Sequence, residues 1–144
     1  MTADIIRLAR RFSELGGTKG IEPRRGMIFL NTSNGLEVLI TRVGKTQIYT
    51  ENGNYNRSAW GYNTPILPCD ELWAWLLQRQ RRVVQNSNKW ENGKFVLQFY
   101  HASGLPNRSE WRDDKELTTP SLHHALYSAA VWVAEKEAAN GNRP

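Results

Sequence analysis

The chain has 144 residues, of which 40% are hydrophobic and 23% are charged, a composition that excludes a disordered chain. Its length predicts a single domain spanning residues 1–144, and no apolar run reaches the ~18 residues that a membrane span needs. The formal net charge of +5 permits contact with nucleic acid or another polyanion without requiring it.

The first segment is expected to be an amphipathic helix. Thr2 can cap it, apolar residues recur at helical spacing, and Gly16-Gly17 ends it, because glycine accepts the left-handed conformation. Three arginines fall largely off the apolar stripe: Arg7, Arg10 and Arg11. They form either a solvated face or a binding surface.

The first helix also bears on localisation. Its apolar residues are interrupted by charged ones, unlike the continuous apolar stretch of a secretory signal. Cys69 is the single cysteine and has no partner for an internal disulfide, which fits a reducing compartment. Both features favour a cytoplasmic protein.

Three strands are expected after the first helix. Residues 27–31, 36–43 and a segment within "TQIYTENG" are rich in strand formers. Asn34-Gly35 and Asn52-Gly53 are strong signals for tight hairpin turns. The segment therefore reads as a three-stranded antiparallel meander.

The next stretch, "NYNRSAWGYN", mixes aromatic residues with asparagines and has no acidic residue. In one interpretation Tyr55, Trp60 and Tyr62 cover the end of the sheet while the asparagines form turns. In the other, Arg57 joins these rings in a contact surface for a protein partner, a nucleotide or single-stranded nucleic acid. The residues alone leave both interpretations open.

A second helix is expected from Pro68 onwards, with Asp70 and Glu71 at its positive end. Its apolar face comprises Leu72, Trp73, Leu76, Leu77, Val83 and Val84. Its last turn carries Arg79, Arg81 and Arg82. The helix dipole explains the positions of these charged residues without any ligand, since cations are favourable at the C-terminal end of a helix.

The C-terminal part predicts a hairpin at Asn92-Gly93, a central strand over residues 95–101 and a short edge strand around 109–113. A last helix is expected to start with Thr119 as cap and Pro120 at its first position. Its buried stripe comprises Leu122, Ala125, Leu126, Ala129, Ala130 and Val133. The fold class is α+β, an antiparallel sheet of four to five strands with three helices in the order α-β-β-β-α-β-(β)-α.

Signatures of catalysis are absent from the sequence. It has no phosphate-binding glycine loop with its lysine, no dinucleotide fingerprint, no H-E-x-x-H and no nucleophile elbow. Cys69 begins a helix and could be reactive, but a lone cysteine is more often a small core residue. His123 and His124 point about a quarter-turn apart and are poorly placed to share one metal. His101 with Glu110 or Asp113 could do acid–base work only if the fold brought them together. The chain is therefore expected to be no enzyme and to carry no metal or cofactor.

Tryptophan is unusually frequent, with six residues. Core packing is expected to take Trp73 and Trp132, because each buried indole removes ~150–250 Å² from water. Tryptophans in polar loops suit interface anchors, since Trp, Tyr and Arg dominate binding hot spots. The candidate partner-binding residues are Tyr55, Arg57, Trp60, Tyr62, Trp90, Trp111, Arg24 and Arg25.

The segment from Phe95 to Glu137, "FVLQFYHASG…WRDDKELTTPSLHHALYSAAVWVAEKE", places a strand, a short polar strand and a Pro-x-Leu-x-x-Ala-Leu-x-x-Ala-Ala helix in order. In this it resembles the small phage-encoded "ABA sandwich" proteins. The resemblance implies a viral or prophage accessory protein, a class with many non-enzymatic inhibitors of host defence, including anti-CRISPR proteins. It implies no role for any single residue.

The leading hypothesis is thus a non-catalytic phage binding protein that occupies the surface of a larger host protein or ribonucleoprotein complex. The alternative is a nucleic-acid or nucleotide-binding protein that uses the same loop aromatics and basic faces. A membrane partner is not expected.

Overall fold

The computed structural model describes residues 3–31, 35–79, 81–91, 94–101, 112–119 and 121–139, with only the backbone described in the strands between 81 and 119. The chain forms two compact units. The sheet unit comprises residues 9–67, and the helix-pair unit comprises residues 1–8 and 68–144. The single domain expected from the length stays a prediction.

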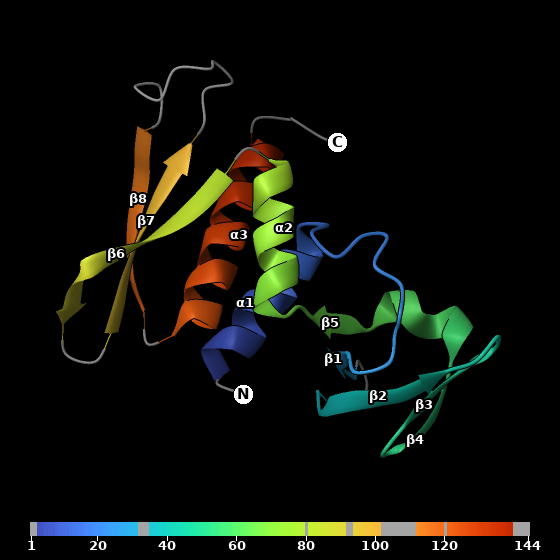
Figure 1. Cartoon of the computed structure of the whole chain (residues 1–144). Coiled ribbons are helices and arrows are strands. Elements are labelled where there is room, and N and C mark those ends of the chain that lie inside the picture. The colour runs from blue at the N-terminus through green and yellow to red at the C-terminus, as the bar shows by residue number, and fades with distance from the viewer. Residues whose placement is uncertain are drawn as a thin grey trace. The chain divides into compact units, whose positions relative to one another are not determined.

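The α+β fold class is confirmed (Figure 1). The sheet unit contains an open five-stranded antiparallel sheet in the order β4-β3-β2-β1-β5. Its strands are β1 (Ile28–Leu30), β2 (Glu37–Val43), β3 (Gln47–Thr50), β4 (Gly53–Asn56) and β5 (Thr64–Ile66), and the 3-10 helix η1 (Arg57–Tyr62) joins β4 to β5. The expected meander is β1-β2-β3. Strands β4 and β5 extend it at its two edges.

The core of the sheet unit lies on one face of this sheet. In β2, Val38 and Ile40 are buried while Glu37, Leu39 and Thr41 are exposed, which is the period-two alternation of a half-buried strand. The buried cluster comprises Met27, Phe29, Val38, Ile40, Ile48 and Trp60. Burial on this face fixes the register, because a one-residue slip would turn every side chain to the other face.

Both expected hairpin turns differ in detail. Leu30 pairs with Glu37, so a six-residue connection, not a two-residue turn, joins β1 to β2. Gly35 within it has a φ of +70°, whereas Asn34 lies outside the described residues. At the second turn Thr50 pairs with Gly53, so the central residues are Glu51 and Asn52. The Thr50 hydroxyl decides this register, since it accepts the Asn52 N–H at 3.1 Å and donates to the Gly53 carbonyl at 2.7 Å.

Helix α1 (Ala3–Glu14) ends as the sequence predicted, and its end belongs to the sheet unit. The Gly17 N–H donates to the Phe12 carbonyl and the Gly16 N–H to that of Ser13, with Gly16 at a φ of +84°. This is the Schellman arrangement, which satisfies the last carbonyls of a helix. The expected cap, Thr2, lies outside the described residues.

Helix α2 (Cys69–Gln78) starts after Pro68, with Asp70 and Glu71 in its first turn as expected. The prediction that it continues through Val84 is wrong. The chain leaves the helix at Arg79 and enters strand β6 (Arg81–Glu91). β-Branched Val83 and Val84 pair with strand β7 there, so tertiary pairing outweighs the helical spacing of the apolar residues.

A second antiparallel sheet in the order β6-β7-β8 belongs to the helix-pair unit. Strand β7 (Lys94–His101) is central, as predicted, and Glu91 pairs with Lys94 across the expected hairpin. The hairpin is not short, because β6 has 11 residues. Strand β8 (Arg112–Thr119) lies further along the chain than the edge strand expected at 109–113, and residues 109–111 are outside the described part.

Helix α3 (Leu122–Ala139) begins later than predicted. Thr119 ends β8, so it cannot cap the helix; the Ser121 hydroxyl accepts the His124 N–H at 3.1 Å instead. The predicted stripe is buried except for its first member, Leu122, which is exposed. Tyr127, Val131 and Ala134 are also buried, so the helix is enclosed on more than one side.

Helices α2 and α3 lie side by side in the helix-pair unit (Figure 1). The Arg79 guanidinium joins them, because its Nε lies 3.0 Å from the Glu137 carboxylate and its plane stacks 3.7 Å from the Trp75 ring. Trp73 and Trp132, expected in the core, are only half-buried. Each indole is too large to be enclosed on a helix that shares its apolar face with a neighbour.

Candidate binding site

The stretch from Asn54 to Asn63 forms β4, the helix η1 and the approach to β5. Asn56 caps η1, since its Oδ1 accepts from the Ser58 N–H at 3.1 Å and from the Ser58 hydroxyl at 2.9 Å. The Asn63 N–H donates to the Trp60 carbonyl at 3.0 Å and closes the other end. The asparagines of this stretch therefore hold the backbone in place.

Trp60 is a core residue, with only 9% of its surface exposed. Its Nε1–H donates to the Ile21 carbonyl at 2.7 Å, which satisfies the indole donor inside the protein. Its ring meets Phe29 edge to face, with ring centroids 5.4 Å apart, and Phe29 meets Tyr55 in the same way at 5.5 Å. The expectation that Trp60 is presented outward is wrong, because the ring and its donor both have partners in the interior.

Arg57 connects three segments of the sheet unit. Its guanidinium donates to the Gly44 carbonyl at 2.9 Å and lies 3.8 Å from the Glu22 carboxylate. Its backbone N–H donates to the Thr46 carbonyl at 2.9 Å. These contacts fasten the β2–β3 connection, so the charge of Arg57 already has partners within the unit.

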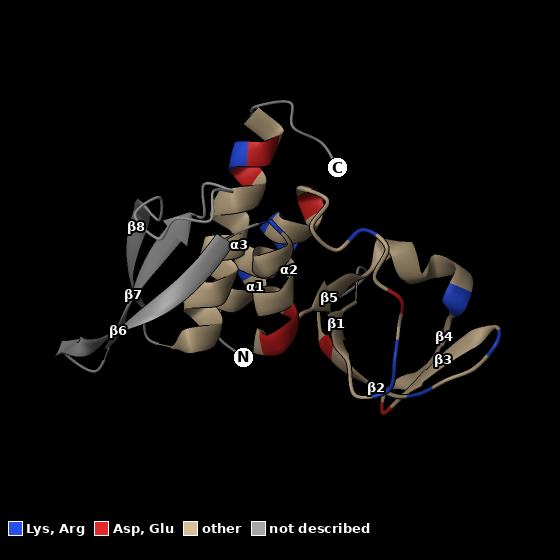
Figure 2. Ribbon diagram, turned by 45° about the horizontal axis from the view of Figure 1, so that its top comes forward, with Lys and Arg blue, Asp and Glu red and all other residues tan. Residues whose placement is uncertain are grey.

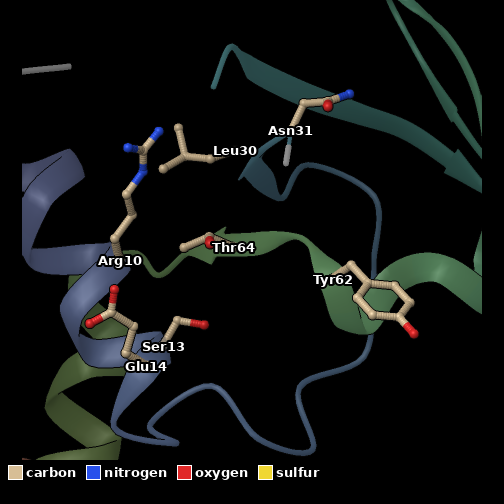
Figure 3. Close-up of a pocket in the computed structure, with 7 residues that line it drawn as sticks. All are labelled: Arg10, Ser13, Glu14, Leu30, Asn31, Tyr62 and Thr64. Carbon is tan, nitrogen blue, oxygen red and sulfur yellow. The ribbon is translucent and has the colours of Figure 1, made fainter. Parts of the chain in front are cut away.

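Tyr62 differs from its neighbours, because 79% of its surface is exposed. It stands at the edge of a hollow of about 370 Å³, which we call the Tyr62 hollow (Figure 3). The lining residues are Arg10, Ser13, Glu14, Leu30, Asn31, Tyr62 and Thr64. An exposed aromatic ring beside charged and hydrogen-bonding groups is the composition of a contact surface.

Four elements, α1, β1, η1 and β5, bring these side chains together. Arg10, Ser13 and Glu14 project from α1, and the pairing of Leu30 with Thr64 aligns the end of β1 with the start of β5. Figure 3 shows Tyr62 at the opposite end of the group from Arg10, with its ring directed outward.

Gly35 lets the Arg10 guanidinium approach the β1–β2 connection. A Cβ at Gly35 would lie 3.0 Å from Nη2 of Arg10. The backbone of Gly35 also has a positive φ, which L-residues with a side chain seldom adopt. The positive φ favours glycine at this position, and a side chain there would also push the flexible end of Arg10 aside.

A second hollow of about 450 Å³ lies in the same unit, and we call it the glycine-loop hollow. It is lined by the loop after α1 and by the segment around η1: Ser13, Gly16, Thr18, Lys19, Gly20, Ile21, Glu22, Trp60, Gly61, Asn63 and Pro65. The hydroxyls of Ser13 and Thr18 are 2.9 Å apart and bond to each other. Lys19 and Glu22 bring opposite charges, so the lining has no single charge preference.

Four predicted partner-binding residues remain to be placed. Arg24 and Arg25 are exposed in the loop before β1. Trp90 lies in β6, where only the backbone is described, and Trp111 lies outside the described residues. The Tyr62 hollow thus contains one residue of the predicted set.

The candidate set lacks every lining residue except Tyr62, namely Arg10, Ser13, Glu14, Leu30, Asn31 and Thr64. The basic face of the first helix was a signal for Arg10, and no signal in the sequence indicated Asn31 or Thr64. Their convergence depends on the pairing of β1 with β5, and β5 is a three-residue strand that carries no pattern long enough to read.

None of the described residues considered for chemistry is among the lining residues of either hollow. Burial raises the pKa of the Cys69 thiol above its ordinary value, and the Asp70 carboxylate adds to the shift. Nε2 of His124 is 3.9 Å from the Asp4 carboxylate, and the His123 ring lies 5.2 Å from that of Tyr127. The predicted acid–base residues His101 and Asp113 lie in β7 and β8, where side chains are not described.

Two further kinds of feature are absent from the described residues. They contain no group of three or more histidine, cysteine, aspartate or glutamate side chains placed to hold a metal ion. Among them there is also no helix with the length and apolar character needed to cross a membrane.

Comparison with known proteins gives no relative from which a role could be transferred. No protein-family model, no curated protein and no solved structure matches the chain.

Proposed function

We propose that this chain is a non-catalytic binding protein that attaches to a larger protein partner through the Tyr62 hollow. The observation that carries the proposal is the exposure of Tyr62, a bulky aromatic residue with 79% of its surface in solvent, at the edge of a hollow lined by Arg10. Tyrosine and arginine are enriched among the residues that dominate binding energy. A ring with this much surface in solvent can bury a large apolar area against a partner.

The phage resemblance of residues 95–137 supports a finer proposal about the partner. An accessory protein of that kind would act in the cytoplasm of a bacterial host, on a defence complex such as a CRISPR ribonucleoprotein. Binding would inhibit the complex by occupying its surface, with no bond made or broken.

Direct binding of nucleic acid is the second candidate, favoured by the basic residues of the sheet unit. Figure 2 shows basic residues in the loop before β1, along the β2–β3 region and in η1. Those with exposed side chains include Lys19, Arg24, Arg25, Arg42 and Lys45. Positive charge of this kind binds phosphates through counterion release.

Affinity capture from a bacterial lysate, with and without nuclease, tests both candidates. We expect a protein partner that the wild-type chain retains after nuclease treatment and that Tyr62→Ala retains at least about tenfold less, since a hot-spot aromatic contributes ~2 kcal/mol or more. Leu77→Ala is the matched control, because Leu77 is an exposed apolar residue of the helix-pair unit. Equal retention by Tyr62→Ala and the wild type would refute the role of the hollow, and capture that nuclease abolishes would favour nucleic acid.

A further inference from the structure

Arg10 is the arginine that lines the Tyr62 hollow. Four other arginines of the described chain have a carboxylate within 4.0 Å: Arg7 with Asp4, Arg11 with Glu14, Arg57 with Glu22 and Arg79 with Glu137. Arg10 makes no ion pair and no hydrogen bond within the residues that the structure describes, yet its side chain lines the Tyr62 hollow. A guanidinium in this position is available to an anionic group of a ligand.

The second charge in the hollow limits what that anion can be. The Glu14 carboxylate also lines the hollow, and it lies 3.6 Å from the Arg11 guanidinium. Glu14 repels any anion, but it repels a phosphate with nearly two negative charges more strongly than a carboxylate with one, and the planar fork of Arg10 can bind that carboxylate through two hydrogen bonds. The hydroxyls of Ser13 and Thr64 and the amide of Asn31 add neutral hydrogen-bonding groups. The lining therefore favours a single carboxylate.

The backbone at the hollow favours side-chain docking over strand addition. Strand β5 is an edge of the sheet and contains Pro65, which has no N–H to donate to an added strand. The volume of the hollow, about 370 Å³, is near the lower limit for ligand sites in proteins. A hollow of this size can hold a few side chains of a partner. At its outer end, the exposed ring of Tyr62 offers an apolar surface with a polar tip.

We propose that the Tyr62 hollow recognises an acidic side chain of the protein partner, with the carboxylate bound by Arg10 and an apolar or aromatic side chain of the same partner packed on Tyr62. This inference rests on the proposed function and adds the chemistry of the partner's contact surface. The hollow thereby selects partners that carry an exposed aspartate or glutamate near an apolar residue.

A titration with short peptides tests the inference on the full-length ¹⁵N-labelled chain. The probes are acetyl-Phe-Gly-Glu-Gly-amide, its matched glutamine peptide and adenosine monophosphate, followed in proton–nitrogen spectra up to roughly 20 mM, because contacts this small bind in the millimolar range. We expect the glutamate peptide to shift the signals of the Arg10 Nε–H, Gly35 and Thr64. The glutamate peptide should bind about tenfold more tightly than the glutamine peptide. The reason is that the neutral amide cannot form the charge-assisted bidentate pair with the Arg10 guanidinium.

Two variants locate the charge that is responsible. Arg10→Gln should remove the preference for glutamate, and Arg7→Gln, which changes an exposed arginine already paired with Asp4, should leave it intact. No response to any peptide, equal affinity for the two peptides, or a preserved preference in Arg10→Gln would overturn the inference. Tighter binding of adenosine monophosphate than of the glutamate peptide would also overturn it and replace the acidic side chain by a nucleotide.

The two proposals fail separately. The titration needs no cellular partner, so an absent peptide response together with Tyr62-dependent capture refutes only the acidic side chain. A positive titration together with capture that ignores Tyr62 refutes the proposed function and leaves the chemistry of the hollow standing.

Discussion

At the scale of single residues, two aromatics only two positions apart have opposite roles. Trp60 is inside, because the Ile21 carbonyl accepts its N–H and Phe29 packs on its ring. Tyr62 is outside, at the edge of a polar hollow. The residues around Trp60 and Tyr62 in the sequence do not indicate which ring is buried. The contacts that bury Trp60 come from residues elsewhere in the chain.

Replacing Trp60 by phenylalanine should destabilise the sheet unit. The change removes the donor to the Ile21 carbonyl and leaves space beside Phe29, so we expect the free energy of unfolding to fall by roughly 1–3 kcal/mol. Urea unfolding followed by circular dichroism measures it. Tyr62→Ala is the contrasting variant and should stay within about 0.5 kcal/mol of the wild type. A Trp60→Phe protein as stable as the wild type would show that the indole hydrogen bond contributes nothing.

Gly17 and Gly61 form a matched pair for testing close packing. A Cβ at Gly17 would lie 2.3 Å from Cζ of Phe12, which is fully buried and has no room to withdraw, whereas a Cβ at Gly61 would meet nothing within 4 Å. We expect Gly17→Ala to cost about 1–3 kcal/mol and Gly61→Ala to change stability by less than about 0.5 kcal/mol. Thermal unfolding of the two variants compares them, and equal melting temperatures would contradict the tight packing at the end of α1.

At the scale of elements, local chemistry set the end of α1 and the start of α2, whereas the start of α3 and the length of α2 departed from the local signals. Gly16-Gly17 stops α1 and Pro68 precedes α2, as the sequence indicated. The same sequence predicted that α2 runs to Val84, but residues from Arg81 onward pair with β7. Local signals mark where a helix can begin or end, and pairing with a distant strand decides between helix and strand for a segment that suits either.

The contact between α2 and α3 offers a test at this scale. Arg79 stacks on Trp75 and pairs with Glu137, and the two charged side chains are only 22% and 25% exposed. Arg79→Lys keeps the charge and loses the planar fork, so we expect a loss of about 1–2 kcal/mol in unfolding free energy. A double-mutant cycle with Glu137→Gln measures the coupling by urea denaturation.

The control for that cycle is Arg11→Lys, because the pair of Arg11 with Glu14 is largely exposed. Solvent screens such a pair, so this variant should change stability by less than about 0.5 kcal/mol. Equal changes in unfolding free energy for Arg79→Lys and Arg11→Lys would show that the stacked, partly buried geometry of Arg79 adds no stability.

At the scale of the whole molecule, the net charge of +5 is spread along the chain. Part of it is matched locally by carboxylates, as at Arg7, Arg11 and Arg57. Charge dispersed in this way should give weak, sequence-independent attraction to nucleic acid and no dedicated groove. It is compatible with a protein partner as the principal target.

A salt titration with a fluorescent single-stranded oligonucleotide distinguishes these cases. We expect detectable binding only at low salt, with the affinity falling steeply as salt rises, at a slope of about −0.7 per phosphate neutralised. Anisotropy at a series of salt concentrations gives the slope directly. Tight binding that persists at about 150 mM salt would favour the nucleic-acid candidate over a protein partner.

The sequence by itself determined the α+β class, the alternation that buries one face of β2 and the glycine and proline ends of the helices. For the helix ends this holds at the glycine end of α1 and the proline start of α2, whereas α3 starts later than its threonine and proline indicated. The properties that were determined depend on neighbouring residues, whose spacing and backbone preferences can be read along the chain. Only the tertiary structure decided that Trp60 is enclosed, that Arg57 is occupied, and that Arg10 and Tyr62 line one hollow. Those outcomes depend on partners far away in the sequence, such as the Ile21 carbonyl for Trp60, and on strand pairings that bring separate segments to the same edge.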